Sequence, residues 1–187
     1  MTHKEFIDKH DLGPDKEAGT GNYWIENGYL IVRSLPLFTD MKQYTELPEK
    51  IVFECSGLTQ DLTFDDIEEI PHGVTFMNSG YLSLYRCMKV APGTVFRNGG
   101  VIKMNLIEEL PEGTEFNNRA NVSLPSLKKL SPNIKFNNAG EIFLFKVNSF
   151  GKGIEFNNIN NIYCSIPSPK KVNKQYYFNI VANQLAE

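Results

Sequence analysis

Apolar positions recur along this chain at a constant interval. A phenylalanine occurs every twenty residues over the second half of the sequence, and an asparagine stands two positions after each one. The phenylalanines are Phe76, Phe96, Phe116, Phe136 and Phe156, and the asparagines are Asn78, Asn98, Asn118, Asn138 and Asn158. Because a unit of this size cannot bury an apolar face alone, the repeat predicts stacked copies that share one continuous core.

Each unit contains a short segment in which apolar and polar residues alternate. In residues 120–124, Val122 and Leu124 are apolar and the residues between them are polar, which indicates a strand with one buried face. Residues 113–116 indicate a second short extended piece. Leu127 and Leu130 are three positions apart, a spacing that favours a single helical or 3₁₀ turn.

The repeat can be followed upstream of Phe76. Phe53 begins a copy that is three residues too long, and the extra residues fall before Leu62. Trp24 is interpreted as the start of a first copy, with Leu30 and Val32 at the expected places and a loop within residues 39–49. The pattern therefore predicts a mainly β fold, a parallel β-solenoid or leucine-rich-repeat-like stack of about seven coils over residues 22–166.

The two ends of such a stack need covering segments, because the outermost coils expose unpaired strand edges. Residues 1–21 are predicted to form an N-terminal cap with a short helix around Phe6 and Ile7, ended by Gly13 and Pro14. Residues 167–187 are predicted to form a C-terminal cap. Their apolar spacing favours a helix, and a final strand is the alternative.

The units resemble a known class of repeat protein. The segment Ile107–Gly113, which reads IEELPEG, and the paired asparagines are similar to short bacterial leucine-rich repeats, although Phe rather than Leu precedes the Asn and the usual leucine order is not kept. Tandem F-N-N-x-G units also resemble repeat proteins of bacteria and their phages. The resemblance implies a solenoid over residues 24–165 and transfers no activity.

Composition narrows the classes of function. The chain has 187 residues, 41% hydrophobic and 22% charged, with a formal net charge of −3. The weak negative charge argues against nucleic-acid binding and against an anionic membrane surface. The sequence has neither an apolar run long enough to span a membrane nor an apolar secretion signal, so a cytoplasmic location is expected. The three cysteines lack the spacing of a zinc site or a disulfide framework.

Candidate catalytic residues are sparse. His72 lies in a Pro-x-Gly corner and is interpreted as a solvated turn residue, and no nucleophile–base pair is visible beside it. Cys87 and Cys164 occupy positions that other copies fill with apolar residues and are predicted to be buried, whereas Cys55 could be exposed. The acidic pairs 65–66, 68–69 and 108–109 are interpreted as a solvated edge. A non-enzymatic protein without cofactor or metal is expected.

The outward side of the alternating segment carries aromatic residues. If the apolar residues of this segment point inward, five aromatic side chains point outward: Tyr81, Tyr85, Phe143, Phe145 and Tyr163. Exposed aromatic residues are typical of binding surfaces, and Arg86, Lys103 and Lys146 could form a polar rim.

Three functional hypotheses follow from this face. The first is a protein-interaction module that binds a partner protein and could inhibit it, with a phage or bacterial anti-defence factor as the context that the resemblance suggests by analogy. The second is a carbohydrate-binding or carbohydrate-active β-helix protein. Nucleic-acid binding is the third and the least favoured. Homo-oligomerisation or cover by the C-terminal segment would also explain the exposed rings.

Overall fold

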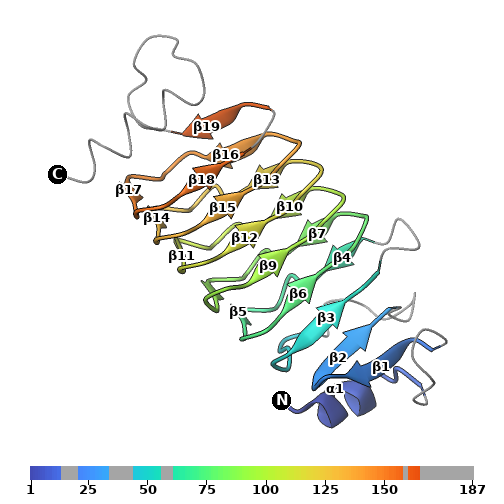
Figure 1. Cartoon of the computed structure of the whole chain (residues 1–187). Coiled ribbons are helices and arrows are strands. Elements are labelled where there is room, and N and C mark those ends of the chain that lie inside the picture. Colours follow the sequence, from blue (N-terminus) through green and yellow to red (C-terminus); the bar gives the residue numbers. More distant parts are fainter. Residues whose placement is uncertain (14–20, 34–43, 56–60, 158–159, 165–187) are drawn as a thin grey trace, which may run out of the picture.

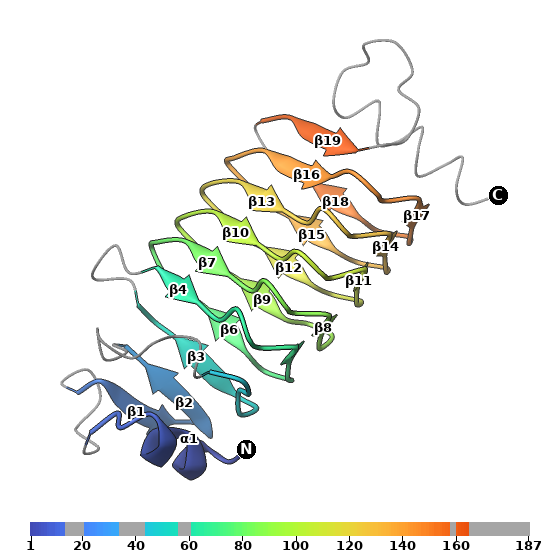
Figure 2. The same ribbon diagram turned by 180° about the vertical axis from the view of Figure 1, so that it is seen from behind.

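The chain forms a parallel β-solenoid in which short strands stack coil upon coil along one axis (Figure 1). The computed structural model describes residues 1–13, 21–33, 44–55, 61–157 and 160–164. The described coils amount to about six turns, one fewer than the sequence predicts. Each complete coil contributes one strand to each of three parallel ladders, and the reverse view in Figure 2 shows the second of these ladders in front.

The first ladder, sheet I, carries the repeated phenylalanines. Its strands hydrogen-bond in the order β1-β2-β3-β6-β9-β12-β15-β18, and all pairs are parallel except β1 with β2. The strands are β1 (Tyr23–Glu26), β2 (Tyr29–Val32), β3 (Ile51–Phe53), β6 (Thr75–Phe76), β9 (Val95–Phe96), β12 (Glu115–Phe116), β15 (Lys135–Phe136) and β18 (Glu155–Phe156).

The second ladder, sheet II, is formed by the alternating segments and is parallel throughout. Its strands are β4 (Leu62–Thr63), β7 (Leu82–Ser83), β10 (Ile102–Lys103), β13 (Val122–Ser123), β16 (Ile142–Leu144) and β19 (Ile162–Cys164). The predicted inward residues of β7 and β16 are fully buried, which confirms the alternation.

The third ladder lies at the corner between the other two sheets and is here called the corner ladder. It has two parts, β5 with β8 and β11 with β14 and β17. The strands are β5 (Glu69–Ile70), β8 (Lys89–Val90), β11 (Glu109–Leu110), β14 (Lys129–Leu130) and β17 (Ser149–Phe150). The predicted helical turn at Leu127–Leu130 is therefore wrong, because Lys129 and Leu130 form strand β14 and the turn lies one step earlier, where the Leu127 N–H donates to the Leu124 carbonyl at 3.2 Å.

A bulge explains why a strand shows helical spacing here. The N–H groups of Lys128 and Lys129 both donate to the carbonyl of Glu108, at 2.7 and 3.0 Å. Two successive residues opposite one partner place both side chains outward, as at a β-bulge. Leu127 and Leu130 are consequently both buried with two exposed residues between them.

The phenylalanines form one column of stacked rings inside the solenoid. From Phe53 to Phe156, neighbouring centroids lie 4.8 to 5.6 Å apart with interplanar angles between 2° and 7°. The separation follows from the spacing of hydrogen-bonded strands, because identical residues occupy identical register in each coil. The column supplies much of the continuous hydrophobic core that the repeat predicts.

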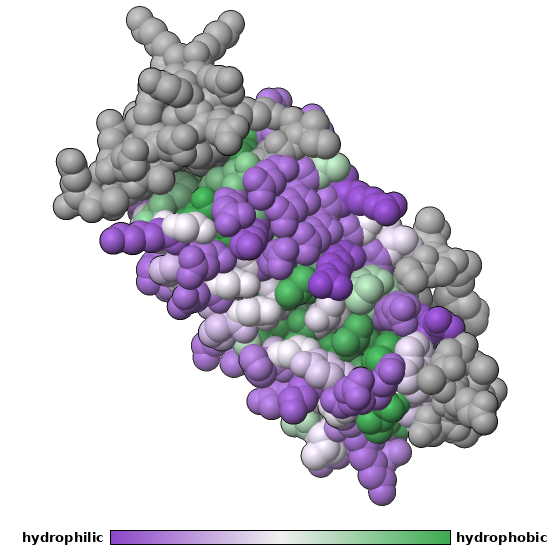
Figure 3. Space-filling model, in the orientation of Figure 1, coloured by the Kyte–Doolittle hydropathy of each residue, from purple (hydrophilic) through white to green (hydrophobic). Residues whose placement is uncertain are grey.

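The asparagines that follow the phenylalanines occupy two different environments. The buried asparagines stand two positions after a phenylalanine and donate to main-chain carbonyls of the turn, as Asn98 does to Gly80 and Gly100 at 2.9 Å each. Hydrogen bonds between asparagine side chains occur instead at the position directly after the phenylalanine, where Asn137 donates to Asn117 at 2.8 Å and Asn157 donates to Asn137 at 2.9 Å. In Figure 3, hydrophilic side chains accordingly gather over β12 and β15, and more apolar surface lies over β6 and β9.

The N-terminal end of sheet I differs from the prediction. β1 and β2 form an antiparallel hairpin around Asn27 and Gly28, both with positive φ, and Val32 pairs with Phe53 in the column register. Trp24 is thus not the start of a first coil. The dipeptide Asn-Gly between two apolar runs is a strong hairpin signal, and here its turn chemistry prevails over the apparent repeat.

A short helix closes this end of the stack, as the sequence predicts. Helix α1 (His3–Lys9) begins with a capping box in which Thr2 accepts from the Glu5 N–H and the Glu5 carboxylate accepts from the Thr2 N–H. Phe6 is fully buried, and its ring lies 6.4 Å from Phe53, the first ring of the column. The predicted C-terminal cap, residues 167–187, lies outside the described residues.

Candidate functional site

The five predicted binding residues lie on the outer side of sheet II but do not form one continuous patch. Tyr81 and Tyr85 flank β7, whereas Phe143, Phe145 and Tyr163 belong to β16, its following turn and β19. Two strands, β10 and β13, separate the two groups. We call the first group the tyrosine cluster and the second group the C-terminal aromatic cluster.

The C-terminal aromatic cluster is an ordered set of rings. Phe143 stacks on Tyr163 with centroids 5.0 Å apart and an interplanar angle of 7°, because the two residues are register partners in β16 and β19. Phe145 lies 5.7 Å from Phe143 in a tilted arrangement. Phe145 is 47% exposed and Tyr163 is 39% exposed. The hydroxyl of Tyr163 donates to Glu141 at 3.0 Å, which holds the outer ring in place.

The tyrosine cluster is positioned by aspartates of the preceding coil. Asp61 accepts the main-chain N–H of Tyr81 at 2.7 Å, and Asp65 accepts that of Tyr85 at 3.3 Å. Asp65 also accepts a hydrogen bond from Ser83, which is buried. Tyr85 is 49% exposed, and Tyr81 is half-buried.

Between the two clusters, the outward-facing side chains of β10 and β13 are polar. Lys103 and Ser123 occupy the column that Phe143 occupies in its own coil. Three strand spacings of about 4.8 Å place the clusters about 14 Å apart, well within the footprint of one protein interface. Of the predicted rim residues, Lys146 is exposed beside Phe145, and Lys103 lies between the clusters.

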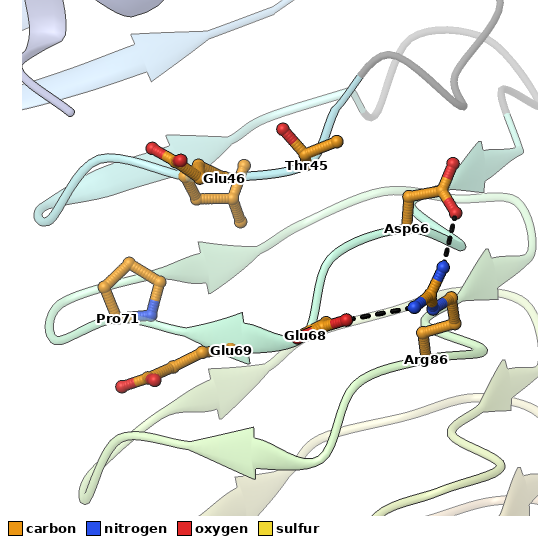
Figure 4. A pocket seen from close by; sticks show the side chains of 8 residues that line it. Thr45, Glu46, Asp66, Glu68, Glu69, Pro71 and Arg86 are labelled. Atoms are coloured by element: carbon orange, nitrogen blue, oxygen red, sulfur yellow. Dashed lines mark hydrogen bonds and ion pairs between the residues drawn. The ribbon is translucent and has the colours of Figure 1, made fainter.

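Arg86 is directed toward the corner ladder instead of the rim. Its guanidinium contacts Glu68 at 3.0 Å and Asp66 at 3.6 Å, as Figure 4 shows. The acidic pairs of the sequence are likewise engaged in ion pairs between coils. Lys128 contacts Glu108 at 2.7 Å and Lys129 contacts Glu109 at 2.6 Å. The edge is therefore solvent-exposed, as predicted, and its charges alternate in sign from coil to coil.

Hydrogen bonding lowers the pKa of one carboxylate at this edge. Hydrogen bonds from Lys129 and Ser131 hold the pKa of Glu109 below its ordinary value. Both hydrogen bonds stabilise the ionised carboxylate across the gap between two coils.

The cysteines differ in part from their predicted environments. Cys87 is fully buried as predicted, and burial raises its pKa to about 12. Cys55 was expected to be exposable but is also buried, and burial raises its pKa to about 11. Cys164 is half-buried on β19. A thiol with a raised pKa is mostly protonated near neutral pH and is a poor nucleophile, so Cys55 and Cys87 act as packing residues.

The histidines have separate surroundings. His72 is exposed in its corner, as predicted. His10 is buried between Phe6 and Tyr44, with ring centroids 4.6 and 4.0 Å away. Within the described residues, no group of three or more His, Cys, Asp or Glu side chains has a geometry that could hold a metal ion. The same residues contain no helix long and apolar enough to cross a membrane.

Sequence reasoning missed two exposed apolar residues. Met88 is 49% exposed and Leu106 is 41% exposed, and both lie near the corner ladder. Prolines in alternate coils, Pro71 and Pro111, mark this region in the sequence, and so does the alternation of Glu-Glu with lysine-containing pairs. The separation of Pro71 and Pro111 by forty residues, twice the spacing of the phenylalanines, was the available signal, and the next position in that series is Gly151.

The chain was compared with protein-family models, with curated proteins and with solved structures, and none of the three comparisons found a match.

Proposed function

We propose that this protein is a non-enzymatic interaction module that binds a partner protein through the outer side of sheet II. The observation that carries the proposal is the stacked pair Phe143 and Tyr163 with the exposed ring of Phe145 beside it. Rings held on paired strands lose little conformational freedom on binding, which favours their use as anchors.

The proposed interface includes both aromatic clusters. A partner surface of ordinary size covers about 800 Å² on each side and reaches easily across the separation of about 14 Å. The C-terminal aromatic cluster and the tyrosine cluster then supply the apolar anchors, and Lys103 and Ser123 form the flatter floor between them. Lys146 and Glu141 provide polar groups at the margin.

A rigid face of this kind suits inhibition by occlusion, because it can cover the active or binding site of a partner without a conformational change. By analogy with the bacterial and phage repeat proteins that the units resemble, the proposed setting is an anti-defence or otherwise host-directed role in the bacterial cytoplasm. This biological setting is part of the proposal.

The decisive experiment replaces each aromatic residue with the residue that another coil uses at the same position. Ser123 occupies the column of Phe143 and Tyr163, and Asn105 occupies that of Phe145. The triple variant Phe143→Ser, Phe145→Asn, Tyr163→Ser should therefore fold normally. A partner captured from bacterial lysate by the wild-type protein should bind the purified triple variant at least tenfold more weakly in calorimetry.

Tyr29→Ser is the matched control, because Tyr29 is an exposed aromatic residue on sheet I. The control should leave the affinity unchanged. Equal affinity of the triple variant and wild type would refute the proposed face. A dimer in sedimentation that the triple variant abolishes would assign the face to a second copy of the chain, and saturable binding on a glycan array would assign it to carbohydrate.

A further inference from the structure

The corner ladder contains prolines in alternate coils, at the first position after the strand. In three coils this position donates its N–H to the preceding coil. Ala91 donates to Ile70 at 2.9 Å, Ser131 to Leu110 at 3.0 Å and Gly151 to Leu130 at 2.7 Å. Pro71 and Pro111 occupy the equivalent positions and have no N–H to donate.

Both prolines coincide with interruptions of the ladder. β8 and β11 are not paired, and within the described residues β5 has β8 as its only partner. The carbonyl groups of Leu47 and Val90 consequently receive no main-chain N–H from the following coil, among the described residues. The interruption recurs after two coils and leaves sheets I and II continuous.

A surface groove lies at each interruption. The first, here called groove 1, has a volume of about 570 Å³ and runs between residues 45–47 and the β5 corner (Figure 4). The second, groove 2, has a volume of about 500 Å³ and runs between residues 88–92 and the β11 corner. Pro71 lines groove 1, and Pro111 lines groove 2.

Groove 1 is suited to a cation with an apolar stem. Glu46, Asp66, Glu68 and Glu69 contribute carboxylates to its lining, and Arg86 is its one basic residue. Arg86 already contacts Asp66 and Glu68 at one end of the groove, and Lys89 contacts Glu69 at 3.6 Å. Among the described residues, Glu46 is therefore the lining carboxylate without an ion pair. Leu47 and Pro71 provide apolar wall. An arginine matches this set, because its guanidinium carries five N–H donors in a plane.

Groove 2 is suited to an apolar side chain. Its lining includes Met88, Val90, Pro92 and Pro111, together with the ion pair of Lys89 and Glu69. The carboxylates of Glu108 and Glu109 in the lining are paired with lysines of the next coil, and this pairing reduces the net negative charge of the groove. Exposed Tyr85 and Leu106 lie in the turns that lead into the same two coils.

We propose that grooves 1 and 2 together bind one extended segment of a partner protein, with an arginine in groove 1 and an apolar residue in groove 2. Two coils at about 4.8 Å each separate the grooves by about 10 Å. In a polyproline II segment, residues i and i+3 lie on one side about 9 Å apart, which matches this separation. This docking site does not include the C-terminal aromatic cluster, on which the function proposed for sheet II rests.

The test uses two blocked octapeptides that differ in direction, Pro-Pro-Arg-Pro-Pro-Leu-Pro-Pro and Pro-Pro-Leu-Pro-Pro-Arg-Pro-Pro. One of them should shift the amide resonances of residues 45–47 and 88–90 together in a titration of the ¹⁵N-labelled full chain. A peptide with Glu in place of Arg should bind at least tenfold more weakly. Failure of both octapeptides to shift either group at millimolar concentration would overturn the proposal.

Proline replacements separate groove geometry from charge. Pro71→Ala and Pro111→Ser introduce the residues that stand at this position in other coils and restore the missing N–H donors. The double variant should close both grooves and weaken peptide binding at least tenfold, with no loss of folding. Unchanged peptide affinity in this variant would overturn the proposal.

Further variants complete the assignment. Pro132→Ala, at an exposed corner position beyond the ladder, is the matched control and should bind the peptide as wild type does. Glu46→Gln should weaken binding several-fold and reduce its salt dependence, and unchanged binding would refute the arginine assignment of groove 1. The triple variant of the C-terminal aromatic cluster should bind the peptide normally, so failure of this proposal is distinguishable from failure of the sheet II interface.

Discussion

The phenylalanine column and the corner ladder pass through the same coils but vary in different ways. Inside, every ring from Phe53 to Phe156 meets an identical neighbour in parallel stacking. At the corner, coils with a proline and two glutamates alternate with coils that carry lysine and an N–H that donates to the preceding coil. A stacked interior requires each coil to match the one before it, whereas a solvent-exposed corner needs only complementarity between neighbours. The corner is therefore free to acquire grooves and charge patterns.

The largest expected effect is on the column. Phe116→Ala removes a fully buried ring between two stacked rings and should lower the free energy of unfolding by about 3–5 kcal/mol in urea titrations. Ser123→Ala, on the outer side of sheet II in the same copy of the repeat, should change it by less than about 0.5 kcal/mol. Similar small losses from both variants would contradict the division between interior and surface.

The pH dependence of stability tests whether the buried N-terminal end of the column excludes a charged His10 side chain. Burial beside Phe6 and Tyr44, and secondarily the charge of Lys9, lowers the pKa of His10 from 6.5 to about 4. The unfolded state then binds the proton more strongly, so the stabilisation present above pH 6.5 is lost as the pH falls toward 4. The difference corresponds to at most about 3 kcal/mol.

Unfolding measured between pH 7 and pH 4 should show this loss. His10→Phe serves as the control, because it keeps an aromatic ring and removes the titrating group. The variant should lose less stability over this pH range than wild type. Parallel pH profiles would show that the end of the stack accepts a charged imidazole.

The turn between sheets I and II should tolerate less change than the corner does. A Cβ atom on Gly140 would lie 2.3 to 2.5 Å from main-chain atoms of Ala120 and Asn121. Gly140→Ala should therefore lower the free energy of unfolding by about 1–3 kcal/mol through overpacking. Gly93→Ala is a useful contrast, since its Cβ meets no atom within 4 Å and only its positive φ opposes the change.

The smallest effect is expected from the charge alternation at the corner. Lys129→Gln removes the ion pair with Glu109, in which both side chains are about half exposed. The loss of stability should be below about 1 kcal/mol and should diminish in high salt. A loss as large as that of Phe116→Ala would show that corner charges, and not the stacked rings, hold the coils together.

Much of the fold was predictable because the repeat is a local pattern with a simple spatial consequence. The register of Phe116 on Phe136, the outward direction of Tyr163 and the extra residues before Leu62 all follow from spacing. Trp24 was misplaced because the repeat was extended across the Asn27–Gly28 turn. Leu127–Leu130 was misread because a bulge gives a strand the same spacing as a helical turn.

The sequence by itself determined the parallel stack and its axial repeat, since identical residues at a constant interval can satisfy one another only by lying in register. Only the tertiary structure decided which side chains meet across the coils. It divided the aromatic residues into two clusters, turned Arg86 toward Asp66 and Glu68, and opened grooves beside Pro71 and Pro111. Those outcomes depend on contacts between residues about twenty positions apart, and the local alternation of apolar and polar residues does not encode them.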